Sequence, residues 1–353
     1  MVRMKELIDG LEKNGVLSEE NFVRLLRDFT KEEVQYAAWK AGKIRDEIYG
    51  KRVYIRGLIE FTNYCKNNCF YCGIRRDNSS VVRYRLTKKQ ILQCCQQGYD
   101  LGFRTFVLQG GEDEAMEDET MVDLVSSIRQ DYPDCAITLS LGERSRESYE
   151  KLYIAGANRY LLRHETADAC HYQKLHPRNM SLENRKKCLR ELKGIGYQTG
   201  CGFMVGTLGQ TEKELAKDLL FIHELHPQMV GIGPFLPHKD TPFGKMPAGD
   251  LELTLFLLSL VRIMEKNVLL PATTALATLH EDGRKLGILA GANVVMPNLS
   301  PGEVRENYAL YNGKKCTGTE SAQALKLLEE EIASIGHKIE KTRGDYLDTV
   351  DET

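Results

Sequence analysis

Hydrophobic and polar residues follow two alternating patterns from about residue 53 onward. Short β-branched or apolar runs predict strands, and the longer amphipathic stretches between them predict helices. The predicted strands are 53–61, 105–109, 136–141, 159–163, 198–205, 229–235, 269–275 and 293–297. The predicted helices are 87–102, 117–130, 145–155, 181–195, 211–225, 250–265, 281–290 and about 319–335. Glycine follows several of them, as expected just past a helix end: Gly102, Gly156, Gly196 and Gly291.

This order of elements predicts an α/β fold. Strands that alternate with helices indicate a parallel sheet, and eight such units favour a closed (β/α)8 TIM barrel. An open doubly wound sheet is the alternative, although it usually has fewer strands and no GxGxxG motif opens a first unit here. In a barrel, the functional residues follow the carboxyl ends of the strands.

The first 50 residues read as helices, with Ser18 and Thr30 as caps that precede acidic first turns. No Pro/Gly/Ser-rich linker follows them. We therefore expect residues 1–50 to be an N-terminal helical extension packed on the barrel, residues 51–345 to form the barrel, and residues 346–353 to be a C-terminal tail.

Composition narrows the class of protein. The 353 residues are 42% hydrophobic and 28% charged, with a formal net charge of -2, which is typical of a soluble globular protein and gives no reason to expect nucleic acid. No run approaches the roughly 20 apolar residues that span a membrane, and residues 1–12 lack the apolar core of a signal peptide. We expect a reducing, cytoplasmic location, where clustered cysteines are metal ligands more often than disulfides.

Three cysteines follow the first predicted strand with C-x3-C-x2-C spacing: Cys65, Cys69 and Cys72. Three thiolates suit an iron–sulfur cluster, and on a four-iron cubane they leave one iron without a protein ligand. Structural zinc usually takes four ligands, and the nearest histidine after Cys72 is His164. Zinc is therefore the weaker alternative.

With an aromatic residue before its last cysteine, this motif resembles that of the radical S-adenosylmethionine (SAM) superfamily. The resemblance implies one [4Fe–4S] cluster whose open iron binds the amino and carboxylate groups of SAM. It also implies that an electron from the cluster cleaves SAM to a 5′-deoxyadenosyl radical, while the barrel supplies orientation and a dry interior.

Longer stretches, covering about residues 45–345, resemble the [FeFe]-hydrogenase maturase family HydE. They include Gly110-Gly111-Glu112 after the second strand, Arg163-His164-Glu165-Thr166-Ala167 after the fourth, and Pro271-Ala272-Thr273-Thr274 on the seventh. Biotin synthase and methylornithine synthase are related families with a similar barrel. The second and third of these stretches favour HydE over both.

The resemblance implies roles for individual residues. Cys65, Cys69 and Cys72 would hold the cluster. The residues expected to bind SAM are Tyr71, Gly110, Gly111, Glu112, Ser140, Glu165, Arg185, Tyr308 and Leu310. Independently of the resemblance, four residues fall on predicted strands, where alternate side chains point into the barrel, and are expected to bind substrate there: Arg56, Arg163, Thr273 and Thr274. From the residues alone, Glu112 could equally begin an ordinary strand-to-helix turn, and Glu165 with Arg185 could be a structural ion pair at the barrel rim.

Some HydE proteins carry a second cluster with C-x7-C-x2-C spacing near the C-terminus. Cys316 matches the first position here, but Ala324 and Leu327 occupy the other two, so no second cluster is expected. The remaining cysteines are expected to be core or neutral positions: Cys94, Cys95, Cys135, Cys170, Cys188 and Cys201.

As a HydE-like enzyme, the chain would process an iron–carbonyl–cyanide–cysteine precursor. Its expected partners are the tyrosine lyase maturase, the GTPase scaffold and an electron donor such as ferredoxin or flavodoxin, with no nucleic acid and no membrane. Two alternatives stay open. One is a radical SAM mutase or sulfur-inserting enzyme that acts on a small organic substrate, and the other is a non-enzymatic zinc-binding barrel.

Overall fold

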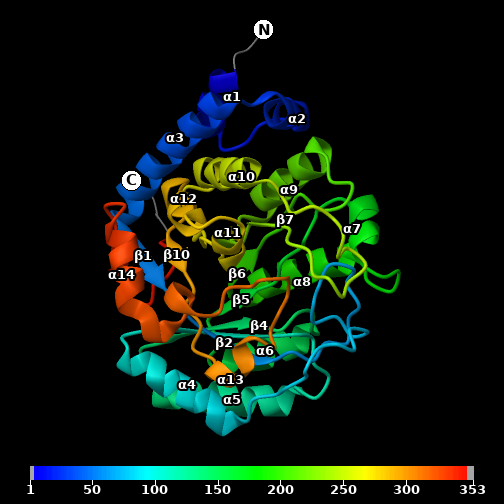
Figure 1. The fold of residues 1–353 in the computed structure, drawn as a ribbon, viewed down its shortest axis with the longest axis vertical. Coiled ribbons are helices and arrows are strands. Elements are labelled where there is room, and N and C mark those ends of the chain that lie inside the picture. Colours follow the sequence, from blue (N-terminus) through cyan, green and yellow to red (C-terminus); the bar gives the residue numbers. More distant parts are fainter. Residues whose placement is uncertain (1–3, 348–353) are drawn as a thin grey trace.

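The computed structural model describes residues 4–347 and contains a parallel β-barrel with helices around it (Figure 1). The strands are β1 Arg52–Ile55, β2 Gly57–Thr62, β3 Thr105–Gly110, β4 Ala136–Ser140, β5 Arg159–Leu161, β6 Gln198–Cys201, β7 Met204–Val205, β8 Met229–Val230, β9 Gly233–Pro234, β10 Val294–Val295 and β11 Lys338–Glu340. Parallel pairs join β2-β3-β4-β5-β6-β8 and β10-β1-β11. Isolated bridges from Met229 to Leu269 and from Pro271 to Val294 complete the circuit, so the eight predicted units form the (β/α)8 barrel.

Four predicted strands differ from the structure, and three of them are divided in two: 198–205 forms β6 and β7, and 229–235 forms β8 and β9. The first predicted strand is divided at Arg56, because β1 pairs with β10 and β11 whereas β2 pairs with β3. The segment 269–275 makes only isolated bridges and then turns into helix α11 Thr274–Leu279. Pro271 has no N–H to donate to a sheet, which limits pairing there. β11 was not predicted, since three residues rich in charge carry no strand pattern.

Helices cover the outside of the barrel. They are α4 Lys88–Asp100, α5 Asp118–Asp131, α6 Arg146–Ile154, α7 Ala169–Leu175, α8 Leu182–Ile195, α9 Glu212–Leu225, α10 Leu251–Met264, α12 Gly283–Leu289, α13 Gly302–Arg305 and α14 Leu325–Ala333. The predicted glycine stops are correct, since Gly102, Gly156, Gly196 and Gly291 have φ angles between 95° and 118°. The last predicted helix begins later than expected, because residues 318–324 form two 3-10 turns.

Three N-terminal helices precede the barrel: α1 Met4–Asn14, α2 Glu19–Asp28 and α3 Lys31–Tyr49. Ser18 and Thr30 are their caps, and Glu33 completes a capping box with Thr30. α3 packs along α10 and α2 along α9, and the rings of Phe29 and Phe256 stack 4.8 Å apart. Buried residues of these helices belong to the same hydrophobic core as the barrel helices.

The amino-terminal end of the barrel is closed by residues near the end of the described chain. The carbonyl oxygen of Arg343 accepts from Thr105 (2.8 Å) and Arg159 (2.9 Å), and Asp345 accepts from Arg159 (2.7 Å) and Gln198 (3.0 Å). Thr105, Arg159 and Gln198 are the first residues of their strands. Of the expected tail, residues 348–353 lie outside the described residues.

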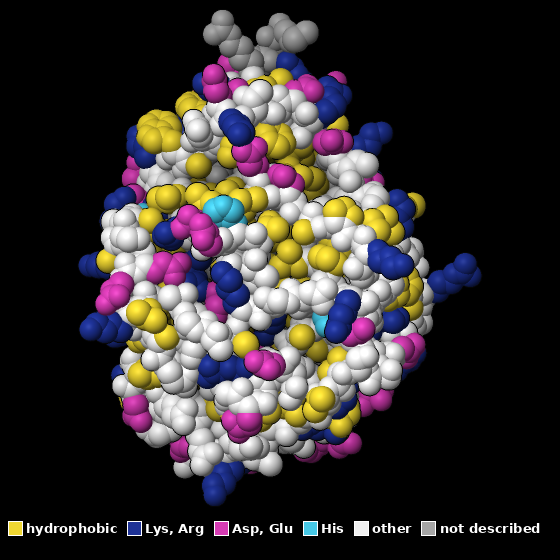
Figure 2. Space-filling view, viewed as in Figure 1, with side chains coloured by type: hydrophobic (Ala, Val, Ile, Leu, Met, Phe, Trp, Pro, Cys, Tyr) yellow, Lys and Arg dark blue, Asp and Glu magenta, His cyan; other side chains and the backbone are white. Residues whose placement is uncertain are grey.

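The surface carries mixed charge. On the face shown in Figure 2, Lys and Arg side chains are interspersed with Asp and Glu side chains, in keeping with a net charge of -2. Among residues 4–347, no helix is both long enough and apolar enough to cross a bilayer.

Candidate active site

The cysteine motif lies on the loop that leaves β2, at the carboxyl end of the barrel. Backbone hydrogen bonds hold this loop on three sides. Lys66 N donates to Glu112 O (2.9 Å), Phe70 N donates to Leu175 O at the end of α7 (2.9 Å), and Gly73 N donates to Leu310 O (2.8 Å). The three cysteines are half-buried free thiols. The loop is therefore shaped by segments that follow β3, β5 and β10.

Two glycines allow the backbone to approach this loop closely. A Cβ at Gly111 would lie 2.1 Å from the carbonyl oxygen of Tyr64 and 2.7 Å from Cβ of Cys65. A Cβ at Gly73 would lie 2.1 Å from the carbonyl oxygen of Ala309. Both contacts are with backbone or Cβ atoms that cannot turn aside, so each position requires glycine.

The three thiols occupy a site that disfavours free thiolates. Burial raises the pKa of Cys65 and Cys69 above the usual range for thiols, and it raises the pKa of Cys72 to about 12. Repulsion between neighbouring thiolates adds to these shifts. Bound iron reverses this effect, because a metal-coordinating thiol is deprotonated. Three soft donors on one half-buried loop fit the cluster that the spacing indicates.

Arg185, in the first turn of α8, connects the loops after β3 and β4. Its Nε donates to Glu143 Oε1 (2.5 Å), and its Nη2 lies 3.8 Å from Glu112 Oε1. Lys66 Nζ lies 3.7 Å from the other oxygen of Glu112. Arg185 thus pairs with Glu112 and Glu143, whereas the sequence suggested Glu165 as its structural partner.

Glu165 follows β5 with a left-handed backbone (φ 66°), which is uncommon for a residue other than glycine. Its Oε2 lies 3.2 Å from Arg163 Nη2 and is buried without a hydrogen bond. Backbone strain of this kind persists only where the surroundings hold it in place, and it is common at functional sites.

A buried pair behind Glu165 provides that support. Asp218 Oδ1, on α9, accepts from Ala167 N (2.5 Å) and lies 3.2 Å from His164 Nε2, and both side chains are fully buried. Gly202 N donates to His164 Nδ1 (3.3 Å), so the ring proton is on Nε2, facing Asp218. Burial lowers the pKa of His164 well below its usual range, which keeps the ring neutral. Sequence reasoning missed Asp218, since it lies on a distant helix with no motif around it.

The other candidate SAM residues lie around the same loop. Tyr71 donates its hydroxyl to His176 Nε2 (3.2 Å), and Ser140 is the last residue of β4, opposite Gln109 of β3. Gly110 ends β3, where a Cβ would lie 2.7 Å from Thr62 Cγ2. Tyr308 and Leu310 belong to the C-terminal stretch that bonds to Gly73.

A buried ion pair anchors this C-terminal stretch. Lys314 Nζ lies 2.5 Å from Glu60 Oε1 on β2, and it also donates to Tyr308 O (3.0 Å). Asn298 donates to the other oxygen of Glu60 (2.8 Å). Sequence reasoning also missed this pair, whose members are separated by 254 positions.

Two cavities flank the cysteine loop. The outer cavity, of about 820 Å³, is open to solvent, and its lining includes Cys65, Glu112 and Glu143. The inner cavity, of about 100 Å³, has a lining that includes Cys72 and Arg163. The outer volume is within the range of about 300–1,000 Å³ that is common for small-molecule sites, and the inner one suits a compact group.

The four candidate substrate residues do not all line the same cavity. Arg163 and Thr273 line the inner cavity, and Arg163 Nε, Arg163 Nη2 and Thr273 Oγ1 are buried without hydrogen bonds. Arg56 is 1% exposed and its Nη1 contacts Met229 Sδ (2.7 Å), while its Nε and Nη2 have no hydrogen-bond partner. Thr274 lies outside the inner cavity: its hydroxyl donates to Glu320 (2.7 Å), and the residue lines a different cavity. The turn that begins α11 separates the two threonines.

Comparison with known proteins agrees with this geometry. The model of the Radical SAM superfamily matches residues 59–222. The chain is 45% identical over 298 residues to the "[FeFe] hydrogenase maturase subunit HydE" of Thermotoga maritima, covering 84% of this chain and 85% of that protein. It is 29% identical over 310 residues to the 3-methylornithine synthase of Methanosarcina acetivorans, covering 87% of this chain and 86% of that one.

The fold has a solved counterpart. The crystal structure of methylornithine synthase (PylB) matches 95% of this chain and 97% of its own, with a TM-score of 0.83 and 28% identity. The higher identity to the maturase, over most of both chains, separates the two families. The chain therefore belongs to the [FeFe] hydrogenase maturase family HydE of the radical SAM superfamily, and it is a radical SAM enzyme.

Proposed function

We propose that this enzyme uses one [4Fe–4S] cluster and SAM to process an iron–carbonyl–cyanide–cysteine precursor during assembly of the [FeFe]-hydrogenase active site. The family implies the cluster and SAM. The observation that carries the finer proposal is the inner cavity beside Cys72, where buried Arg163 donors have no hydrogen-bond partner in the chain. Such donors suit a small anionic or cyanide-bearing substrate.

Cys65, Cys69 and Cys72 would hold the cluster. When bound, the cluster supplies the electron that cleaves the S–C5′ bond of SAM and produces a 5′-deoxyadenosyl radical. The chain itself orients the reactants: Gly111 and Gly73 let the loop pack tightly, and the surrounding segments limit the entry of water.

The SAM site would lie between the cysteine loop and the ends of β3, β4 and β5. Glu112 would accept hydrogen bonds from the amino group of SAM, and Arg185 Nη2 would donate to its carboxylate, since this atom makes only a long ion pair with Glu112 among the described contacts. Glu165 would accept from the ribose hydroxyls, with Ser140 nearby. Tyr71, Tyr308 and Leu310 would border the adenosine, next to Gly110 and Gly111.

The substrate would occupy the inner cavity. Arg163 and Thr273 would contact it directly, because both residues line the cavity and carry buried polar atoms without hydrogen bonds. Arg56 would extend the site deeper into the barrel. Burial and the neighbouring Arg159 lower the pKa of Arg56 well below the usual range, so a nearby anion would stabilise its charged form.

We propose a single cluster, since Ala324 and Leu327 replace the cysteines that would accompany Cys316 in a second site. We also propose the tyrosine lyase maturase and the GTPase scaffold as partners, with ferredoxin or flavodoxin as electron donor. The family assignment supports these partners in general terms.

Anaerobic reconstitution tests the cluster. We expect about four irons per chain and reductive cleavage of SAM to 5′-deoxyadenosine with dithionite. Cys65→Ala should lose both. Cys170→Ala, which removes an exposed cysteine, is the matched control and should retain both. Retention of cluster and SAM cleavage by Cys65→Ala would refute the assignment.

A maturation assay with the sister maturases tests the substrate. The enzyme should accelerate hydrogenase activation when it is added to the other two maturases and the apo-hydrogenase. Wild-type enzyme that cleaves SAM but does not support maturation would favour an organic substrate instead. Metal analysis that shows zinc and no iron–sulfur absorbance would favour the zinc-binding barrel.

A further inference from the structure

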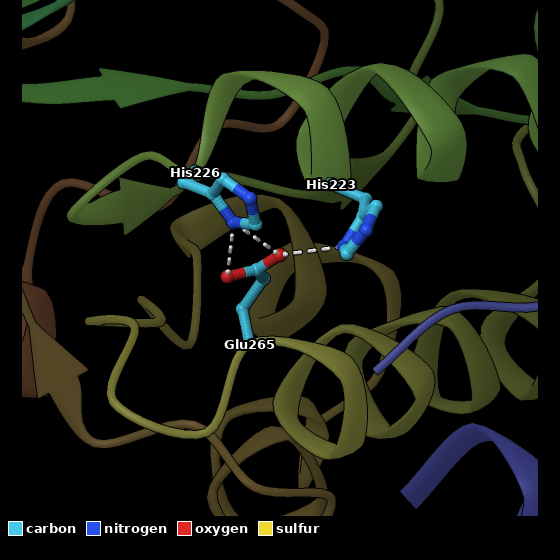
Figure 3. A group of neighbouring side chains, drawn as sticks. All are labelled: His223, His226 and Glu265. Atoms are coloured by element: carbon cyan, nitrogen blue, oxygen red, sulfur yellow. Dashed lines mark hydrogen bonds and ion pairs between the residues drawn. The ribbon is translucent and has the colours of Figure 1, made fainter. Parts of the chain in front are cut away.

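Two histidine side chains and one glutamate side chain at the ends of two helices lie close together (Figure 3). His223 is in the last turn of α9, His226 is the C-cap residue of α9, and Glu265 is the C-cap residue of α10. Both helices run back from the carboxyl end of the barrel, so their C-termini lie at its amino-terminal end. Among residues 4–347, this is the only group of three or more His, Cys, Asp or Glu residues whose ligand atoms all lie within 4.8 Å of one another.

The distances from each histidine nitrogen to the glutamate carboxylate match those between ligand atoms around a tetrahedral metal ion. His223 Nδ1 is 3.5 Å and His226 Nδ1 is 3.3 Å from Glu265 Oε1, and His226 Nδ1 is 3.4 Å from Oε2. Zinc bonds of about 2.0–2.1 Å in tetrahedral geometry place adjacent ligand atoms about 3.3 Å apart. The side chains would therefore need little movement to bind an ion between them.

Two of these atoms lack hydrogen bonds. His223 Nδ1 and Glu265 Oε1 are buried atoms without a hydrogen-bond partner, although they face each other. His226, by contrast, is 58% exposed, so an ion has a route from solvent and a place for a water ligand. Lys193 Nζ donates to the carbonyl oxygens of Leu225 (2.5 Å) and His226 (3.0 Å), so its positive charge is held against the last carbonyl groups of α9.

The backbone of His226 adds an independent observation. It has left-handed angles (φ 45°, ψ 63°), and among residues 4–347 the only other residue besides glycine with positive φ is Glu165, in the proposed SAM site. Glycine adopts this cap conformation without strain. A histidine here directs an imidazole toward Glu265, as Figure 3 shows.

We infer that His223, His226 and Glu265 form a binding site for a divalent late first-row transition metal, with zinc as the best match. Two imidazole nitrogens and one carboxylate oxygen are a ligand set that zinc accepts, and water would occupy the fourth position. The ion would tie the C-terminal end of α9 to that of α10. The site is separate from the radical chemistry and does not depend on the proposed function.

The test is zinc binding by the cluster-reconstituted enzyme in competition with a chromophoric chelator. We expect the wild-type enzyme to bind one zinc ion per chain more than His226→Gly. At a zinc concentration 100-fold above the dissociation constant, the unfolding midpoint of the wild-type enzyme should rise by about 3 °C.

His226→Gly removes a ligand and keeps the left-handed cap, so it should fold normally without zinc and show no zinc-dependent shift. Glu265→Gln should bind zinc at least about 10-fold more weakly. His280→Ala, which removes an exposed histidine outside the group, is the matched control and should bind like the wild-type enzyme. Equal zinc binding by the wild-type, His226→Gly and Glu265→Gln enzymes would overturn the inference, as would an unchanged midpoint of the wild-type enzyme in zinc.

Discussion

Arg159 and Arg163 belong to one strand segment but lie at opposite ends of the barrel. Their guanidinium groups differ in how many hydrogen bonds the chain accepts from them. Arg159 begins β5 and is 1% exposed, and four groups of this chain accept hydrogen bonds from its guanidinium: Thr105 Oγ1, Gln198 Oε1, Arg343 O and Asp345 Oδ1. Arg163 lies two residues past β5, with one ion pair to Glu165 and with Nε and Nη2 lacking hydrogen bonds.

The difference separates a structural arginine from one suited to a ligand. Donors of a guanidinium that are buried without acceptors cost free energy. At the amino-terminal end of the barrel, the chain itself supplies acceptors for Arg159. At the carboxyl end, a ligand in the inner cavity would supply acceptors for Arg163. Replacement of each arginine should therefore affect a different property of the enzyme.

Arg163→Met should have the largest effect. We expect maturation activity to fall about 10²–10³-fold, in the range for loss of a preorganised charged donor. The unfolding midpoint should stay close to that of the wild-type enzyme, since only the ion pair to Glu165 is lost and the Arg163 side chain is 33% exposed. Maturation assays and thermal unfolding measure the two properties. Unchanged activity would remove Arg163 from the substrate site.

Arg159→Met should show the reverse behaviour. It removes the buried cation that pairs with Asp345 and leaves Arg343 O with Thr105 as its remaining donor, so we expect the free energy of unfolding to fall by about 3 kcal/mol. Activity per folded molecule should change less than about 3-fold at a temperature where the variant is folded. Denaturant unfolding followed by circular dichroism measures the loss. A stable variant with low activity would contradict the comparison.

Asp218→Ala tests the support of the carboxyl end. Without this side chain, Ala167 N–H loses its acceptor, two residues beyond the left-handed turn at Glu165. We expect KM for SAM to rise about 10-fold, with iron content unchanged. Lys217→Ala is the control, because Lys217 is on the same helix and its exposed side chain pairs with Asp168. It should keep the wild-type KM for SAM. If only stability changed in Asp218→Ala, the pair would have no positioning role.

The smallest expected effect concerns pH at the amino-terminal end. Burial opposes ionisation of Asp345, but hydrogen bonds from Arg343 and the charge of Arg159 outweigh it and lower its pKa to about 2. The folded-state pKa is below the ordinary 3.8, so this contribution to stability is fully present above about pH 4 and is lost as pH falls through 2. Asp345→Asn should reduce the midpoint difference between pH 5 and pH 2.5. An identical difference in both proteins would show that Asp345 contributes nothing.

Much of the fold could be predicted because the barrel repeats one unit. The period of apolar residues and the glycine stops located most strands and helices within a few residues. The division of the first strand at Arg56 was not predicted, because it depends on which neighbours each half finds. The segment 269–275 looked like a strand, yet the proline and the cap of α11 left it only isolated bridges.

The candidate site was predictable where its residues are close in sequence. Cys65, Cys69 and Cys72 share one loop, and Glu112 and Glu165 each follow a strand. Partners that come from distant elements were missed or misassigned. Arg185 pairs with Glu143 instead of Glu165, and the supports from Asp218 and Lys314 lie on segments without a motif.

The sequence by itself determined the cysteine spacing, the alternation that builds a barrel and the family to which the chain belongs, since these are local or repeating properties of the chain. The tertiary structure alone decided which buried charges are satisfied. Hydrogen bonds and ion pairs form over a few ångströms between residues far apart along the chain, so only the folded barrel distinguishes Arg159 from Arg163 or brings His223, His226 and Glu265 together.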